Sequence, residues 1–335
     1  MKLRSKIIII TALILIFSTG VFAQKRSTAN WFGYVRTAYQ YNLLDEGDNT
    51  GQFKLIVTTL GLVADINDYS SLYIFSFFDY PGVFNPEIPS SARKYAGILD
   101  AQVWFKPVKG LRLVMGQFVM PFATENLQSA SKVDFINWGY VISNSPAYRD
   151  IGAYADYKHE LFRLYMGVSN GSGMNVVDNN NNKRIIARGE LTPSDGLKIA
   201  GGTSIGKDDQ IDSLAESQSF YSANLSYKTS GLFVTAEGSY QEYRDDRTTA
   251  FYAYALYDIA IGGKLLHFIT PAFRYDFLDI PGDDNRKDRY TMGLGFSFAE
   301  DKWLSLFRLN YELITSQTDT DPADNITLEF QMRFD

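Results

Sequence analysis

The chain has 335 residues, of which 15% are Phe, Trp or Tyr and none is Cys. Without cysteine there can be no disulfide scaffold, thiolate metal site or cysteine nucleophile. The formal charge is −6, and loss of an N-terminal leader would leave 29 basic residues against 38 acidic ones, a charge of −9. This acidic balance argues against nucleic acid as a partner.

The N-terminus has the three parts of a secretory signal peptide. A basic start is followed by an apolar stretch over residues 7–17 and by a small residue at Ala23. The basic residues are Lys2, Arg4 and Lys6. A retained anchor is the alternative, but the apolar stretch is short for a spanning helix. We therefore expect cleavage near Ala23/Gln24, with residues 1–23 as the signal peptide and residues 24–335 as one domain.

The remaining chain alternates apolar and polar residues over short segments, as strands with two different faces do. The last segment is the clearest case: its apolar positions are Ile326, Leu328, Phe330, Met332 and Phe334, and its polar positions are Thr327, Glu329, Gln331 and Arg333. Strands with one aromatic face and one charged face are typical of proteins whose outer solvent is lipid. Such strands must close into a barrel, because hydrocarbon cannot satisfy an open sheet edge.

Sixteen segments of this kind follow an exposed lead over residues 24–30. They are 31–41, 52–65, 69–79, 96–106, 111–118, 150–157, 161–169, 184–192, 197–206, 218–228, 232–243, 249–258, 265–278, 289–298, 303–315 and 325–334. Seven tight turns alternate with eight longer connections, and Pro193-Ser194-Asp195-Gly196 is the strongest turn signal. An even barrel with both termini in the periplasm has this pattern. The predicted fold is an all-β, transmembrane antiparallel β-barrel of 16 strands.

The face of each residue follows from the same alternation. In the segment 96–106, for example, Leu99 is expected to share the apolar face of Ala101 and Val103. Asp100 and Gln102 are then expected on the polar face, which turns inward in a barrel.

The longest break, Val119 to Arg149, would be the third outer loop. It is too apolar for a free surface loop, and a structureless connection of this length is normally functional or misassigned. We expect it to fold into the barrel and narrow the lumen, with a constriction lined by Lys132, Asp134, Asn137 and Arg149. The alternatives are a missed strand pair and a cover over the mouth of the barrel.

Arginines recur on the polar faces of the predicted strands. The candidates for lining the lumen are Arg36, Arg112, Arg163, Arg184, Arg188, Arg274 and Arg308. An arginine facing lipid at mid-depth costs about 2–4 kcal/mol, so these side chains should face inward. They would form a basic track for anions. Alternatively, the nearly equal number of strand acids would pair with them in salt bridges that stiffen the wall.

Catalysis has little support in the sequence. Only two histidines exist, His159 and His267, and no serine lies near either in a recognisable arrangement. We predict that the protein is not an enzyme and has no cofactor or metal.

The exit of the fifth predicted strand carries a recognisable motif. Residues 111–125 resemble the Gly-Gln-Phe-x-x-Pro-Phe-x-x-Glu signature of the phosphate-selective porin O/P family, with its positions at Gly116, Gln117, Phe118, Pro121, Phe122 and Glu125. Four further segments resemble family motifs in the same order: Arg149-Asp150-Ile151-Gly152, Asn170-Gly171-Ser172-Gly173, Arg274-Tyr275-Asp276 and Leu309-Asn310-Tyr311-Glu312.

The resemblance implies a 16-stranded barrel in the outer membrane of a diderm bacterium, usually a trimer, that passes anions such as phosphate. The expected function is therefore a porin for passive diffusion of small hydrophilic solutes, with a preference for anions. Its expected partners are outer-membrane lipid, small anionic solutes and other copies of the chain. A plugged structural or surface-interaction barrel is the alternative, and an outer-membrane barrel hydrolase is a more remote one.

Overall fold

A computed structural model describes most of the chain from residue 27 onward. The described residues are 27–43, 49–78, 96–143, 145–146, 148–178, 180–208, 216–244, 246–280, 286–316 and 324–335. The expected signal peptide and its cleavage site lie outside these residues. No helix in the described residues is long and apolar enough to cross a membrane.

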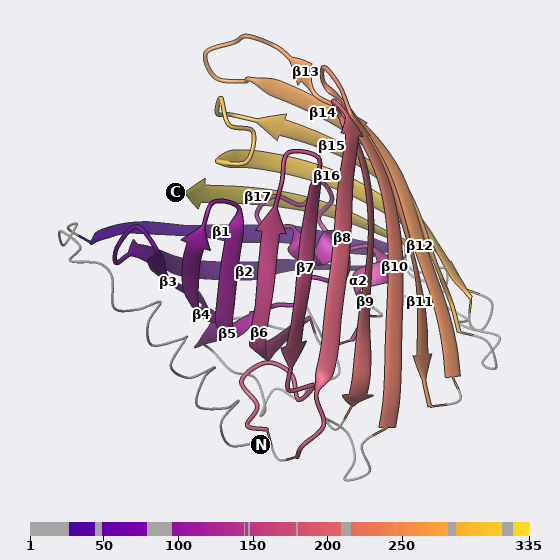
Figure 1. The fold of residues 1–335 in the computed structure, drawn as a ribbon. Helices are drawn as coiled ribbons and strands as arrows, with labels where there is room; N and C mark the ends of the chain where they lie inside the picture. Colours follow the sequence, from indigo (N-terminus) through magenta and orange to yellow (C-terminus); the bar gives the residue numbers. More distant parts are fainter. Residues whose placement is uncertain are drawn as a thin grey trace, which may run out of the picture.

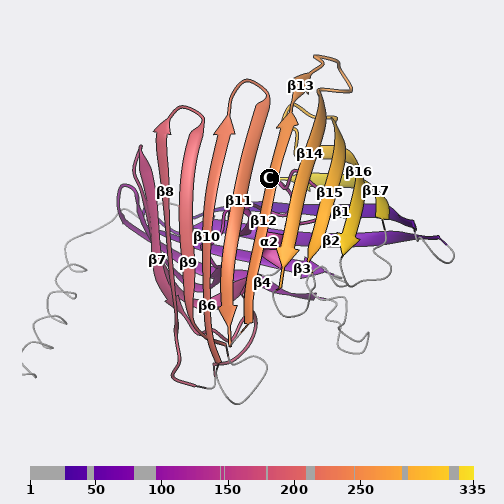
Figure 2. The same cartoon turned by 90° about the vertical axis from the view of Figure 1, so that its right-hand side faces the viewer.

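The described residues form one closed antiparallel β-barrel (Figures 1 and 2). Its strands are β1 (Thr28–Leu43), β2 (Thr50–Asp65), β3 (Ser70–Phe78), β4 (Ala96–Val108), β5 (Leu111–Val119), β6 (Arg149–Lys158), β7 (Phe162–Ser169), β8 (Arg184–Ser194), β9 (Leu197–Asp208), β10 (Glu216–Lys228), β11 (Leu232–Tyr243), β12 (Asp246–Tyr257), β13 (Ile259–Ala260), β14 (Phe268–Asp279), β15 (Lys287–Ser297), β16 (Ser305–Ser316) and β17 (Asp324–Phe334). Each strand pairs with its neighbours in sequence, and β1 closes the ring by pairing with β17. The two-residue β13 continues the line of β12 along β14, so the barrel has 16 staves.

The strands separate an apolar outer face from a polar inner one. On β17, Phe330 is 44% exposed, whereas its neighbour Glu329 is fully buried. The same alternation places carboxylates, amides and arginines inside the ring on β1, β8, β14 and β16. An apolar outside with a polar inside is the arrangement of a barrel in a membrane.

Each of the sixteen predicted strands overlaps an observed one. The predicted turn over residues 193–196 is also present, with Gly196 at φ +80°. A Cβ atom there would lie 2.0 Å from the carbonyl oxygen of Lys228, so both the backbone angle and the space require glycine. This turn and those between β4 and β5, β6 and β7, and β10 and β11 lie at one end of the barrel, called here the turn end.

Three details of the prediction were wrong. The first strand begins at Thr28, inside the expected lead, because residues 28–30 pair with residues 63–65 of β2. The connection between β11 and β12 was expected to be long, but pairing continues to Tyr243 and Asp246, and Arg244 adopts φ +57° in a tight turn. The two faces of β4 are also exchanged at one point.

That exchange comes from a β-bulge in β4. Phe75 of β3 pairs with Asp100, but the next residue, Ser76, pairs with Ile98. Leu99 is therefore the extra residue, and it is buried together with Asp100 instead of sharing the outer face of Val103. A bulge reverses the alternation for one residue, which period-two counting cannot anticipate.

Candidate functional site

The candidate site is the segment between β5 and β6, called here the lumenal segment (residues 120–148). Its described residues contain no strand, only a 3-10 helix, Glu125–Leu127, and the short helix α2, Tyr140–Ser143. The predicted alternative of a missed strand pair is therefore wrong for these residues. In both ribbon views α2 lies within the ring of strands, and it contacts β11, β12 and β14 (Figures 1 and 2).

The family motif shapes the start of this segment. Gly116 has φ +128°, and a Cβ atom there would lie 2.0 Å from the carbonyl oxygen of Ala101 on β4. Gln117 donates from Nε2 to the carbonyl oxygens of Ile98 and Leu99, both at 2.9 Å. It also accepts a hydrogen bond from the backbone N–H of Asn175 at 2.7 Å. The glycine and glutamine thus fix the β4 bulge and the strand exit together.

The apolar motif residues pack inside the barrel. Phe118 and Phe122 are fully buried, and Pro121 is buried as well. Phe122 meets Phe220 of β10 edge-on, with ring centroids 4.9 Å apart, and its carbonyl oxygen accepts a hydrogen bond from Ser222 at 2.7 Å. These contacts tie the first part of the segment to the inner face of β10.

The last motif residue, Glu125, faces the segment itself. Its carboxylate accepts hydrogen bonds from the backbone N–H of Gly139 at 3.0 and 3.1 Å, so it joins the two ends of the segment. Burial raises the pKa of Glu125 to about 7, although Arg274 and the Gly139 hydrogen bond act against this. A second buried carboxylate, Glu237 of β11, accepts the backbone N–H groups of Thr124 and Glu125 at 2.6 and 3.3 Å.

Four strand arginines hold the middle of the segment and are called here the anchoring arginines: Arg36, Arg274, Arg289 and Arg308. Each donates to at least one main-chain carbonyl of the segment. Arg36 donates to Ala130 at 3.0 Å and to Ile136 at 2.8 Å, and Arg308 donates to Val133. Arg274 donates to Asn137 at 2.9 Å, and Arg289 to Trp138 at 2.6 Å.

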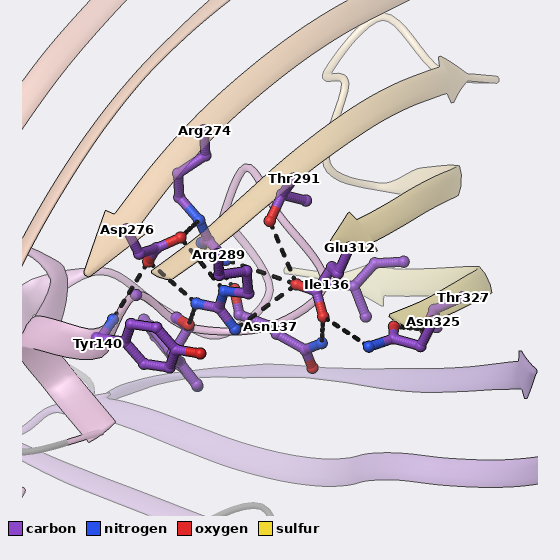
Figure 3. Close-up of polar contacts among 12 residues, drawn as sticks. Ile136, Asn137, Tyr140, Arg274, Asp276, Arg289, Thr291, Glu312, Asn325 and Thr327 are labelled. Atoms are coloured by element: carbon purple, nitrogen blue, oxygen red, sulfur yellow. Dashed lines mark hydrogen bonds and ion pairs between the residues drawn. The ribbon is translucent and has the colours of Figure 1, made fainter. Parts of the chain in front are cut away.

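Three buried carboxylates of the wall balance these guanidinium groups. Glu329 pairs with both Arg36 and Arg308. Asp276 pairs with Arg274 at 2.8 Å and Arg289 at 3.0 Å, and Glu312 lies 3.6–3.7 Å from the same two arginines. Figure 3 shows this second group converging on Asn137 and Tyr140 of the segment. The anchoring arginines therefore bridge strand carboxylates and main-chain carbonyls.

Burial explains why these bridges are needed. An irregular segment has main-chain carbonyls without strand partners, and a buried carbonyl left unpaired costs as much as a lost hydrogen bond. Arginine can satisfy a carboxylate and a carbonyl at once because its guanidinium has five N–H donors. The anchoring arginines are only 1–6% exposed, so they are enclosed between the wall and the segment.

The four residues predicted to line a constriction have different surroundings. Lys132 and Asn137 are both exposed. The Asn137 amide donates a hydrogen bond to the Glu312 carboxylate at 2.8 Å. Asp134 accepts a hydrogen bond from the Tyr254 hydroxyl at 2.9 Å. Arg149, the first residue of β6, is buried in a pair with Asp100 of β4 at 3.2 Å.

The seven predicted lumenal arginines fall into three groups. Arg36, Arg274 and Arg308 are anchoring arginines. Arg184 and Arg188 are buried in the β8 wall, where Arg184 donates to Ser204 and Gln218, and Arg188 donates to Glu190 and to Thr124 of the segment. Arg112 and Arg163 keep 28% and 32% of their side chains exposed while sharing the carboxylate of Asp156.

Sequence analysis missed one anchoring arginine, Arg289, and two residues that assist, Gln331 and Lys302. Gln331 donates to the Ser131 carbonyl oxygen at 2.9 Å, and Lys302 lies 3.8 Å from Asp134. Arg289 could have been found, because it alternates with Thr291 on the inward face of its strand. Lys302 lies in the turn between β15 and β16, where strand alternation gives no signal.

A closed β-barrel with an apolar exterior and charged, segment-filled interior defines a porin-type protein of the outer membrane. The chain belongs to the beta-barrel porin-2, OmpL-like family (BBP2), whose sequence profile matches residues 77–327. A comparison with curated proteins found no match.

Solved outer-membrane barrels have the same fold. The channel DcaP of Acinetobacter baumannii has a TM-score of 0.66 at 13% identity, covering 93% of this chain and 99% of that one. The trimer form of Vibrio cholerae OmpT has a TM-score of 0.61 at 12% identity, covering 92% of this chain and all of that one. Pseudomonas aeruginosa OccK8 (OprE) has a TM-score of 0.55 at 12% identity, covering 91% and 98%.

Proposed function

We propose that this protein is a channel for passive diffusion of small hydrophilic solutes across the outer membrane, with a preference for anions. The observation that carries the proposal is the unequal filling of the lumen. The anchoring arginines hold the lumenal segment against β14–β17 and β1, whereas Arg112 and Arg163 on β5 and β7 remain partly open to solvent. Solute passes on the β5–β7 side.

In this mechanism the lumenal segment sets the width and the open arginines attract the solute. Arg112 and Arg163 share one carboxylate, so a positive charge is left over for a passing anion. The arginines replace only part of the hydration shell of the anion, and they must bind the anion weakly enough to release it. The resemblance of residues 116–125 to the phosphate-selective porin O/P signature supports anions, with inorganic phosphate as a candidate solute.

Planar-bilayer recording tests this function directly. Purified barrel should insert with stepwise conductance, and asymmetric potassium chloride or potassium phosphate should give a reversal potential on the anion side. A folded barrel that inserts without conductance would contradict the channel, and a cation-side reversal potential would contradict the anion preference.

A plugged barrel is the second candidate, because the anchoring arginines are enclosed rather than exposed to a water path. In that case the protein would act through surface loops instead of transport. Deleting residues 135–141, which include Phe135 and the first two residues of α2, separates the two. A plugged barrel opens only after the deletion, whereas a channel conducts before it and gives larger steps afterwards.

We also propose that the mature chain starts at Gln24 and forms a homo-oligomer. The leader pattern supports the first statement, and the trimer form of OmpT among the similar structures supports a trimer. N-terminal sequencing of outer-membrane material and native mass spectrometry check these two points. An uncleaved chain or a monomer would contradict them.

A further inference from the structure

A cavity of about 520 Å³ lies at the turn end of the barrel, on the side that the anchoring arginines leave open. Its wall is formed by strands from β5 to β12. Its cover is the first part of the lumenal segment, through Thr124, Leu127 and Gln128. The cavity is large enough for an organic molecule, since small-molecule sites commonly measure about 300–1,000 Å³.

Four cations line this cavity, although the mature chain is acidic as a whole: Arg112, Arg163, Lys198 and Lys228. Among the described residues that line it, Glu190 is the one acid; it lies 3.8 Å from Lys198 and also accepts a hydrogen bond from Arg188. Lys228 is exposed and has no ion pair among the described residues. The lining is therefore locally electropositive.

The two arginines of the cavity are held in place but not neutralised. Arg163 binds both oxygens of Asp156 at 2.8 Å, and Arg112 binds one of them at 2.6 Å. Two guanidinium groups thus share one carboxylate. The Nε atom of Arg112 is buried without a hydrogen-bond partner, which leaves an unused donor in a fixed guanidinium.

Aromatic rings form much of the remaining lining: Tyr154, Tyr165, Phe233, Tyr252 and Tyr254. They come from two separate parts of the wall, β6–β7 and β11–β12, and all of them line the same cavity. Inorganic phosphate has no apolar surface for such rings. A flat aromatic ring would stack on them, while a carboxylate on that ring would meet the cations.

We propose that the turn-end cavity is a binding site for small aromatic carboxylates. The proposal rests on the proposed channel function for its biological use, since a solute site on the open side of the lumen would select what passes. Binding itself requires only the folded barrel. Arg163, Lys198 and Lys228 supply the positive charge, and Phe233 with the tyrosines supplies the stacking surface.

Isothermal titration calorimetry on the full barrel in detergent tests the site with three probes: benzoate, cyclohexanecarboxylate and inorganic phosphate. Benzoate should bind, cyclohexanecarboxylate should bind several-fold more weakly, and phosphate should bind weakest. Equal affinity for benzoate and phosphate would overturn the proposal, because it would reduce the cavity to a general anion site.

Two variants assign the binding to this cavity. Lys198→Gln combined with Lys228→Gln should weaken benzoate about tenfold, and both lysines lie at the rim, where replacement leaves the fold intact. Phe233→Leu should weaken benzoate but leave cyclohexanecarboxylate unchanged, since it removes a ring and keeps an apolar side chain. Lys183→Gln, in the connection between β7 and β8, is the matched control, and a loss equal to that of the lysine pair would overturn the site.

Conductance measurements distinguish a failure of the channel proposal from a failure of the binding-site proposal. A barrel that conducts but does not bind benzoate would leave the channel standing and overturn the site. A barrel that binds benzoate through Lys198 and Lys228 but does not conduct would support the site and contradict the channel.

Discussion

Two parts of the inner wall carry inward-facing arginines, and the surroundings of these arginines differ. On β14–β17 and β1, the anchoring arginines are enclosed and their donors are spent on Asp276, Glu312, Glu329 and the carbonyls of the lumenal segment. On β5 and β7, Arg112 and Arg163 share one carboxylate, keep about a third of their surface exposed and border a cavity.

The difference lies in what faces each arginine. Where an irregular segment brings unpaired carbonyls, arginine becomes a structural bridge whose charge is compensated and shielded from water. Arg112 and Arg163 donate to Asp156 rather than to carbonyls of the segment, and each keeps a charge that a solute can meet. An arginine on an inward strand face therefore does not by itself identify a basic path, and the comparison can be tested on both sides.

Removing the carboxylate of Glu329 should have the largest effect. Glu329→Gln leaves Arg36 and Arg308 buried without their negative partner, and breaking a buried ion pair costs about 3–5 kcal/mol. Unfolding by urea in lipid vesicles measures the loss. Asp178→Asn is the control, because the Asp178–Lys183 pair lies in a surface connection and its loss should change stability far less. Equal losses of stability in the two variants would contradict a structural role for the anchoring arginines.

Gly116→Ala should come next in size, because it acts where the segment leaves the strand. Alanine at φ +128° is strained, and its Cβ atom would lie 2.0 Å from the Ala101 carbonyl oxygen. We expect a cost of about 3 kcal/mol, near the upper end for a strained backbone position. Refolding yield and urea unfolding measure it. Gly201→Ala is the control, since its Cβ atom would meet only the Ser222 carbonyl oxygen at 3.5 Å, and a similar cost there would contradict the argument.

Neutralising the open arginines should change ion selectivity, and it also leaves the buried Asp156 carboxylate without its partners. Arg112→Gln combined with Arg163→Gln should lower the anion-to-cation permeability ratio about five- to tenfold, since a unit charge about 4 Å from an ion contributes on the order of 1 kcal/mol in water. The reversal potential in asymmetric potassium chloride measures this, and high salt should reduce the difference. Arg308→Gln is the crossed variant: it should destabilise the barrel and leave the reversal potential in place. A shift of equal size in Arg308→Gln would make the two walls equivalent.

The fold was accessible from the sequence because strand alternation is a local property. Residues 326–334 alternate between the outward and the inward face along the sequence, whereas the bulge in β4 interrupts this alternation at Leu99. The β4 bulge at Leu99 was not accessible, because an extra residue depends on how Gln117 and Asn175 hold the neighbouring backbone.

The site was only partly accessible for a related reason. Alternation predicted that Arg36, Arg274 and Arg308 lie inside the barrel, but it did not predict which groups they contact. Whether such a side chain meets water or a carbonyl depends on the path of residues 120–148, which are far from those arginines in sequence. The family motif marked where that path begins, at Gly116, but not which strands it would contact.

Glu125→Gln should have the smallest effect, and it depends on pH. Burial raises the pKa of Glu125 from its ordinary value of 4.5 to about 7. A carboxyl whose pKa is raised by folding costs no stability below 4.5, begins to cost as the pH rises above that value, and costs most above about 7. The full pKa shift would correspond to a stability cost of about 3 kcal/mol. We expect about 1 kcal/mol, because side chains around Glu125 and Arg274 can relax when the carboxyl ionises. Urea unfolding should therefore show Glu125→Gln more stable than the natural chain at pH 8 and equal to it at pH 4. A difference that does not vary with pH would show that Glu125 stays ionised while it joins the two ends of the segment through Gly139.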